Sequence, residues 1–330
     1  MKSILLFIFC CMYAFAASAQ QKPQYSQYMI NNYLINPAIS GIEEYADVKL
    51  GSRQQWAGID GAPFTMYASV HAPIGYSSGG KRSRSATAPS FGRQNQRPAT
   101  RVKPHHGIGL MVMRDKVGSF SRTEVSFSYA YHLLLNDEIK LAAGTSLGII
   151  QQSLQANELK LADPSDNAAV SWSATKPNLS VGLWLYSSTF YVGLSGSQLF
   201  ANDVHFDNNI EERNYLYKHF FLTAAYKFDV TDRFSVIPSV MATWSQPLPG
   251  ALDYNLRVIY ENRVWVGGSY RQNDSFAVLA GVTLNHIFDV SYAYDTGISD
   301  LGGMSSGSHE VVLGMRLFNK RKVLCPSNLW

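Results

Sequence analysis

The stretch Leu252-Asp253-Tyr254-Asn255-Leu256-Arg257-Val258-Ile259-Tyr260 decides the fold of this chain, because its apolar and polar side chains alternate. Successive side chains of a β-strand point to opposite faces, so one face here is apolar while the other carries acid, amide and base. The same alternation recurs in residues 125–133, 220–228 and 311–317. No helical periodicity of useful length follows the first twenty residues. The pattern predicts an all-β protein.

The composition limits the class of protein. Of 330 residues, 46% are hydrophobic and 13% aromatic, which is too apolar for a disordered chain. The mean hydropathy of -0.09 excludes several apolar helices, since each would need about 20 residues. The charged fraction is 16%, whereas soluble domains average roughly 25%. A chain that is aromatic-rich, charge-poor and neutral in hydropathy is typical of a transmembrane β-barrel.

The amino terminus has the features of a cleaved signal peptide covering residues 1–19. A positively charged start and an apolar run at 4–17 precede the small-residue cleavage site Ala17-Ser18-Ala19. A lipid anchor on Cys10 or Cys11 is the less favoured alternative. Cleavage removes both cysteines and leaves Cys325 alone, so a disulfide within the mature chain is excluded and a closed barrel must supply the stability.

Fourteen strands are expected, and many have the length of about nine to twelve residues that a tilted strand needs to cross a bilayer. Tyrosine and tryptophan at or near their ends fit interfacial aromatic girdles. The predicted strands are 46–56, 64–72, 107–115, 122–133, 139–150, 178–186, 189–196, 219–229, 234–245, 251–260, 263–271, 276–284, 288–294 and 308–318. The aromatic residues near strand ends are Tyr226, Trp244, Tyr260, Tyr270 and Tyr294.

Loop lengths separate a membrane barrel from a soluble sandwich, which shares the alternation. Connections after even-numbered strands, such as 187–188 and 261–262, are short, whereas those after odd-numbered strands, such as 151–177 and 197–218, are long. Outer-membrane barrels have short periplasmic turns and long outer loops, and a sandwich gives no reason for such sorting. We therefore predict a transmembrane antiparallel up-and-down β-barrel of fourteen strands, multi-pass in the outer membrane.

Several motifs then suggest a family. They are Gln24-Tyr25-Ser26-Gln27-Tyr28-Met29, Ile35-Asn36-Pro37-Ala38 with Gly41, the stretch Arg53-Gln54-Gln55-Trp56-Ala57-Gly58-Ile59-Asp60-Gly61-Ala62-Pro63, Asp115-Lys116-Val117-Gly118, Leu161-Ala162-Asp163-Pro164, Ser291-Tyr292-Ala293-Tyr294-Asp295 and Gly307-Ser308-His309-Glu310. Across nearly the whole mature chain the sequence resembles the PorP/SprF family of outer-membrane proteins, which belong to the type IX secretion system of gliding and secreting Bacteroidetes. The long basic connection at 75–105 departs from the usual pattern of that family.

The resemblance implies a non-enzymatic outer-membrane component for protein secretion, gliding motility or surface attachment of large adhesins. Its partners would be outer-membrane lipids, periplasmic ring or peptidoglycan-anchored components of the machine, and the carboxy-terminal domain of a secreted adhesin. The alternative is an outer-membrane porin or solute transporter. Nucleic acid is not a sensible partner in that compartment.

The chain divides into a periplasmic amino-terminal segment at 20–44, a barrel at 45–318 with a basic periplasmic loop at 75–105, and a basic tail at 319–330. The loop and tail hold ten candidate docking residues for an acidic partner, although a solvated insertion is the simpler interpretation of the loop. These are Lys81, Arg82, Arg84, Arg93, Arg97, Arg101, Lys103, Lys320, Arg321 and Lys322. Either Phe318 or the terminal Trp330 would be the aromatic assembly signal.

Positive charge is concentrated in the basic loop at 75–105. Of the 28 basic residues, Lys2 leaves with the signal peptide and seven lie in the loop, so 20 remain elsewhere against 24 acidic residues. The rest of the mature chain is therefore mildly acidic.

Inward-facing candidates carry both signs of charge, so the lumen is either a water-filled channel or a closed network of ion pairs. The apolar segment 20–44 needs a place to bury, and we expect it to form a partial plug in the periplasmic mouth; a mobile leader is the alternative. The lumen-lining candidates are Lys49, Arg53, Glu124, His132, Lys227, Asp253, Arg257, Arg263, Arg271, Glu310 and Arg316, together with Asp229 and Asp289.

No catalytic, cofactor or metal site is expected. The chain has no G-x-S-x-G, H-E-x-x-H or C-x-x-C motif. Ser308 and His309 are adjacent and would point to opposite faces of a strand. Asp163, Asp166 and Asn167 offer oxygen ligands for calcium, but D-P-S-D-N is better explained as a turn.

Overall fold

The computed structural model describes residues 25–75, 104–155, 171–200, 203–204, 214–215, 217–245, 248–272, 274–298 and 305–319. Fourteen long strands form one antiparallel sheet that closes on itself. They are β1 (Ala46–Gln54), β2 (Phe64–Ile74), β3 (His105–Val117), β4 (Phe120–Leu134), β5 (Lys140–Leu154), β6 (Trp172–Tyr186), β7 (Phe190–Ser197), β10 (His219–Tyr226), β12 (Phe234–Ser245), β13 (Leu248–Tyr260), β14 (Val264–Arg271), β15 (Ser275–Thr283), β16 (Phe288–Gly297) and β17 (Ser308–Leu317).

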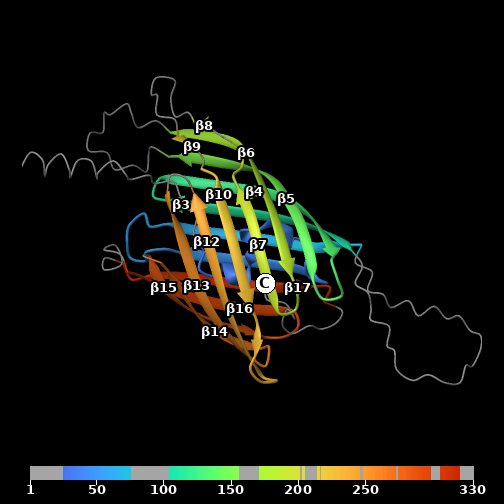
Figure 1. Cartoon of the computed structure of the whole chain (residues 1–330). Coiled ribbons are helices and arrows are strands. Elements are labelled where there is room, and N and C mark those ends of the chain that lie inside the picture. The colour runs from blue at the N-terminus through green and yellow to red at the C-terminus, as the bar shows by residue number, and fades with distance from the viewer. Residues whose placement is uncertain are drawn as a thin grey trace, which may run out of the picture.

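Successive long strands are neighbours in the sheet, and the pairing of the first with the last closes the ring. β1 pairs with β17, in register from Ala46 opposite Leu317, and β10 pairs with β12. Figure 1 shows the strands tilted around a common axis. The prediction of a fourteen-stranded up-and-down barrel is confirmed.

Small differences from the expected strands have local causes. The predicted strand 219–229 ends at Tyr226 and resumes as the short β11 (Phe228–Asp229), because the residue opposite Tyr226 in this register is Pro238, which has no N–H to donate. β6 begins at Trp172, six residues earlier than expected. A two-residue hairpin of β8 (Asp203–Val204) and β9 (Asn214–Tyr215) was not expected.

Burial identifies the apolar face. Along β4, Phe127 is 55% exposed whereas Ser128 is 1% exposed, and the same contrast runs along the neighbouring strands. In a sandwich the apolar face would be covered; here it is the outer surface of the barrel. Large side chains therefore face lipid, and polar ones face inward.

The two ends of the barrel differ in their connections. The turns 135–139, 187–189 and 261–263 lie at the end where β1 begins and β17 ends, which we call the short-turn end. The connections 155–171, 198–218 and 298–307 lie at the opposite, long-loop end. These correspond to the predicted periplasmic and outer ends. The end of β2 and the start of β3, which the basic connection joins, lie at the short-turn end.

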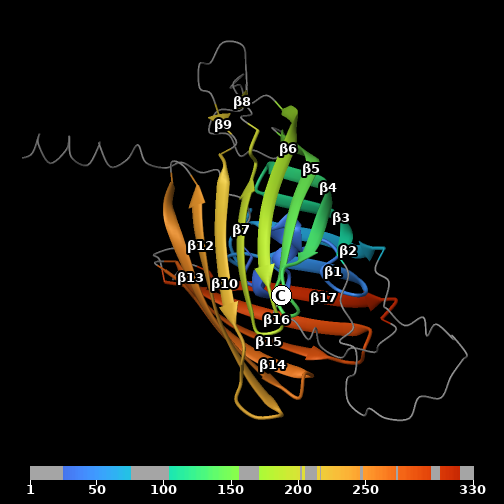
Figure 2. The ribbon, with the colours of Figure 1, turned by 45° about the vertical axis from the view of Figure 1, so that its right-hand side comes forward.

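Residues 25–45 lie inside the barrel, where the dark-blue chain is surrounded by strands in both views (Figures 1 and 2). We call them the plug segment. Three single-turn 3-10 helices, η2 (Tyr28–Ile30), η3 (Asn32–Leu34) and η4 (Pro37–Ile39), make up much of it. No helix in the described part of the chain is long and apolar enough to span a membrane.

Candidate functional site

The plug segment forms one apolar core with the inward residues of the barrel. Tyr25, Tyr28, Tyr33, Leu34, Ile35 and Ile39 are at most 6% exposed, and they join a single cluster with inward side chains from strands around the ring. Polar atoms in the segment are also buried, so each needs a partner inside the barrel.

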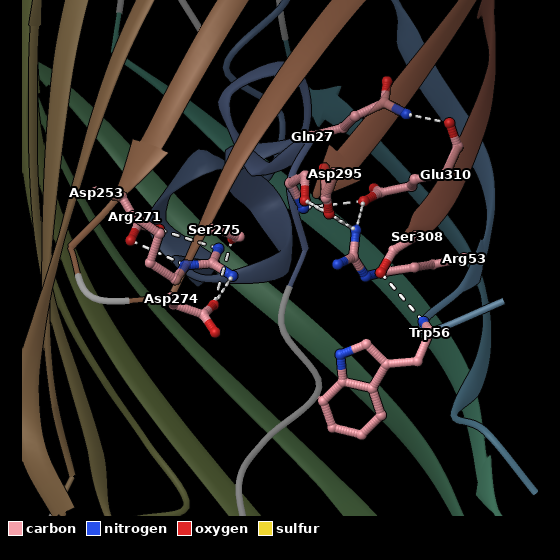
Figure 3. A network of polar contacts seen from close by, with 11 residues as sticks. Gln27, Arg53, Trp56, Asp253, Arg271, Asp274, Ser275, Asp295, Ser308 and Glu310 are labelled. Atoms are coloured by element: carbon pink, nitrogen blue, oxygen red, sulfur yellow. Dashed lines mark hydrogen bonds and ion pairs between the residues drawn. The ribbon is translucent and has the colours of Figure 1, made fainter. Parts of the chain in front are cut away.

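At the long-loop end, an arginine and two carboxylates hold the start of the plug segment (Figure 3). Arg53 of β1 pairs with Asp295 of β16 and, at 3.1 Å, with Glu310 of β17. Arg53 also donates to the Ser26 hydroxyl at 2.8 Å, and the Ser26 N–H donates to a Glu310 oxygen at 2.9 Å. The Gln27 amide donates to the Glu310 carbonyl at 2.9 Å. Charge pairing and hydrogen bonding together offset part of the cost of burying this cluster, in which Arg53 Nε, Asp295 Oδ1 and Glu310 Oε1 have no hydrogen-bond partner among the described residues.

The middle of the plug segment is fixed by side chains that reach the barrel wall. The Asn31 amide donates to the Ser69 hydroxyl at 3.0 Å, and the Tyr33 and Ser128 hydroxyls lie 2.6 Å apart. Asn36 caps η4 by accepting from a backbone N–H, while its amide donates to strand carbonyls of β6 and β7 at 3.0 and 3.2 Å. These contacts fix the depth of the segment as well as its burial.

At the short-turn end, three histidines of β2, β3 and β4 contact two successive peptide groups of the plug segment, on either side of the Gly41 Cα. Gly41 N–H donates to His71 Nδ1 at 3.3 Å, and His105 Nε2 lies 3.0 Å from the Gly41 carbonyl. His132 Nε2 lies 2.8 Å from the Ser40 carbonyl, and its ring stacks on His105 with centroids 4.4 Å apart. The plug segment therefore runs from one end of the barrel to the other, beyond the periplasmic mouth in which the sequence analysis placed it.

Inward glycines make room for this segment. A Cβ on Gly107 would lie 1.7 Å from the Ser40 carbonyl oxygen, and a Cβ on Gly144 would lie 2.5 Å from Ala38 Cα. A Cβ on Gly182 would lie 2.0 Å from an asparagine oxygen of the plug segment. A larger residue would displace plug backbone at Gly107 and Gly144 and the Asn36 side chain at Gly182, so β3, β5 and β6 are shaped to the plug segment. The sequence analysis missed these glycines, whose signal is their inward position in alternating strands.

The remaining inward charges are paired close to one another. Arg316 bonds Asp289 at 3.0 Å, and Lys49 lies 3.3 Å from the same carboxylate. These three side chains lie toward the short-turn end. Two other pairs are Arg122 with Glu124 at 2.9 Å and Arg271 with Asp253 at 3.0 Å (the latter in Figure 3). Among the described side chains, these inward charges form ion pairs, which is what one of the two interpretations of the lumen expects.

The other predicted lumen residues lie elsewhere or less deeply. Arg257 faces inward, is partly exposed and lies over the Trp265 ring. Lys227 follows the end of β10, where it pairs at 3.1 Å with the exposed Asp229. Arg263 lies in the turn before β14 and is exposed. Lys227 and Arg263 lie beyond the ends of strands. Because the alternation of inward and outward side chains does not hold there, these two side chains are not enclosed.

Several predicted features lie outside the described residues. They are the signal peptide, the calcium or turn sequence at 163–167, Trp330, and the ten docking candidates Lys81, Arg82, Arg84, Arg93, Arg97, Arg101, Lys103, Lys320, Arg321 and Lys322. Within the described ranges, no group of three or more His, Cys, Asp or Glu side chains is placed to hold a metal ion.

A small cavity remains between the plug segment and β3–β7. Its volume is about 20 Å³, and its walls include Tyr33, Glu124 and the serines of neighbouring strands. This is space for about one water molecule.

Separate motifs of the sequence meet at the long-loop end of the plug segment. Ser26 and Gln27 come from the first motif, Arg53 from the third, and Asp295 and Glu310 from the last two. They lie up to 284 positions apart in the chain. The motifs that suggested a family thus include the contacts that hold the plug segment in the barrel.

Comparisons with known proteins agree with these motifs. A family model described as type IX secretion system membrane protein PorP/SprF matches residues 17–315. A comparison with curated proteins gives no match.

Among solved structures, the chain is similar to the Ralstonia pickettii toluene transporter TbuX, with 11% identity, a TM-score of 0.48, and coverage of 88% of this chain and 93% of that chain. It is similar to outer membrane protein Omp33 of Acinetobacter baumannii, with 9% identity, a TM-score of 0.45, and coverage of 84% and 99%. A Pseudomonas aeruginosa FadL homologue has 11% identity, a TM-score of 0.48, and coverage of 90% and 94%. The family match covers most of the chain, which therefore belongs to the PorP/SprF family of type IX secretion system membrane proteins and is a barrel of the outer membrane.

Proposed function

We propose that this protein is a non-conducting, non-enzymatic scaffold of the type IX secretion and gliding machinery. The outer loops would hold an adhesin-type substrate through its carboxy-terminal domain. The basic loop and tail would contact periplasmic ring or peptidoglycan-anchored components beneath. One observation carries the proposal: a plug segment bonded at both ends of the barrel occupies the space through which a porin would pass solutes.

Conductance tests the filled lumen directly. The full-length mature protein, reconstituted in planar bilayers, is expected to give no steady single-channel current. Steady porin-like current from the unmodified protein would overturn the scaffold proposal and favour the alternative, an outer-membrane porin or solute transporter.

Surface display tests the scaffold role in cells. Loss of the protein is expected to remove an adhesin exported by the same machine from the cell surface, measured by its accessibility to external protease. Uptake of a small chromogenic substrate should stay unchanged. The opposite result, altered uptake with normal adhesin display, would contradict the proposal.

The ten basic docking candidates are tested by charge replacement. Changing Lys81, Arg82, Arg84, Arg93, Arg97, Arg101 and Lys103 to Gln keeps the loop length while removing its charge. Adhesin display should fall, because an acidic partner would lose its electrostatic contact, while membrane insertion should be normal. A matched variant with Lys320, Arg321 and Lys322 changed to Gln separates the tail from the loop. Normal display in both variants would exclude electrostatic docking.

A further inference from the structure

A hollow of about 420 Å³ lies on the lipid-facing surface of β1, β2, β3 and β17. Ser52 and Ala68 are the small outward residues within it. Ser52 lies between Met66 and Val311 in the strand register, and Ala68 lies beside Leu50. The neighbours are large and exposed, with Met66 at 53%, so the two small side chains leave a recess in an otherwise apolar wall.

Arg114 lines the same hollow. It faces outward, since it alternates with Met113, which is 1% exposed and inward. It lies opposite Met66, three positions before β3 ends at Val117 at the long-loop end. Within the described residues, the Arg114 guanidinium makes no ion pair or hydrogen bond, and the neighbouring Asp115 bonds Thr65 instead. A charged side chain on a lipid-facing strand is costly in hydrocarbon unless it reaches an interface or a counter-charge.

We propose that this hollow binds a phosphorylated saccharolipid of the outer leaflet, with one acyl chain in the recess and a phosphate on Arg114. An acyl chain in the recess gains van der Waals contacts with the walls around Ser52 and Ala68. A guanidinium binds phosphate through two parallel hydrogen bonds, and Lys116, two positions further on the same exposed face, adds positive charge.

The position of Arg114 indicates that the bound lipid comes from the outer leaflet. The long-loop end is the outer end of the barrel, where the saccharolipid leaflet has its phosphates. A phospholipid of the inner leaflet would place its phosphate at the opposite ends of the same strands, out of reach of this side chain. The hollow is separate from the plug segment and from the loops, so this proposal does not depend on the scaffold role.

Native mass spectrometry of the full-length mature protein in detergent measures the binding. The probe is a bis-phosphorylated hexa-acyl saccharolipid, with its dephosphorylated form and phosphatidylglycerol as comparators. We expect R114Q to weaken binding about tenfold, the scale of one lost charge-assisted contact. A68L, which fills the recess without changing charge, should weaken it similarly. The matched control R263Q removes the same charge at the short-turn end and should bind normally.

Heat-modifiable migration in gels establishes that each variant is folded, and S52L replaces A68L if the latter does not fold. Unchanged binding by R114Q or by the recess-filling variant would overturn the proposal. Equal binding of phosphatidylglycerol would overturn the choice of lipid. A dimer that forms without lipid and is lost in A68L would show instead that the hollow is an interface between copies of this chain. None of these outcomes bears on adhesin display.

Discussion

At the scale of single residues, Arg53 has the largest consequence. It is 4% exposed and faces two carboxylates, one of which, on Glu310, is fully buried. Because the wall and the plug segment share this cluster, the loss of the cation would leave buried negative charge at their contact.

Replacement of Arg53 by Met is therefore expected to lower the free energy of unfolding by about 3 kcal/mol. Loss of heat-modifiable migration with increasing urea measures this. The control is Arg233→Met, whose partner Glu261 lies 3.6 Å away with side chains 71% and 44% exposed, so a change below about 1 kcal/mol is expected there. Equal effects of the two substitutions would show that the buried cluster does not stabilise the fold.

At the scale of elements, the plug segment and the strands are complementary in shape. Inward glycines on β3 and β5 lie against plug backbone, and the one on β6 lies against the Asn36 side chain, whereas outward Gly268 on β14 has only one atom, at 3.9 Å, near an added Cβ. A side chain at an inward glycine must move the segment, because the barrel ladder is continuous on both sides of it.

Gly144→Val is thus expected to displace the plug segment and leave the barrel closed. Steady current should appear in planar bilayers, and chymotrypsin should cleave after the tyrosines of the plug segment faster than in the unmodified protein. Gly268→Val is the matched control, with no change in either measurement. If the G144V barrel gives no steady current and is cleaved at the normal rate, the added side chain does not displace the plug segment.

At the scale of the whole molecule, the question is whether the plug segment stays in place while the protein works. The Ser40 and Ser128 hydroxyls are 2.7 Å apart, close enough for a designed disulfide between segment and wall. A scaffold that never opens should tolerate such a lock.

The double variant S40C/S128C, made with Cys325 changed to Ser, is expected to form the disulfide and to support normal adhesin display under oxidising conditions. Display is measured before and after reduction, with S40C alone as the control. Loss of display that returns on reduction would mean that the segment leaves the barrel during function.

The sequence by itself determined the barrel, because alternation, strand length and sorted loop lengths are local properties of successive residues. Thirteen of the fourteen expected strands appear as single elements and the remaining one as β10 and β11. It also determined most inward charges, including Lys49, Glu124 and Arg316. It did not determine the positions of Arg263 and Lys227, because the alternation of inward and outward side chains ends where a strand ends.

The sequence predicted a partial plug from residues 20–44, but only the tertiary structure decided how far the plug segment extends and which residues hold it. The partners of Ser26 are Arg53, Asp295 and Glu310, and no periodicity links residues so far apart; closing β1 onto β17 brings them together. In the closed barrel, glycines of three strands lie against the plug segment, and Arg114 lies beside a lipid-facing recess. The physical reason is that strand formation depends on neighbours in the chain, whereas occupation of a lumen depends on side chains that meet only after the ring has closed.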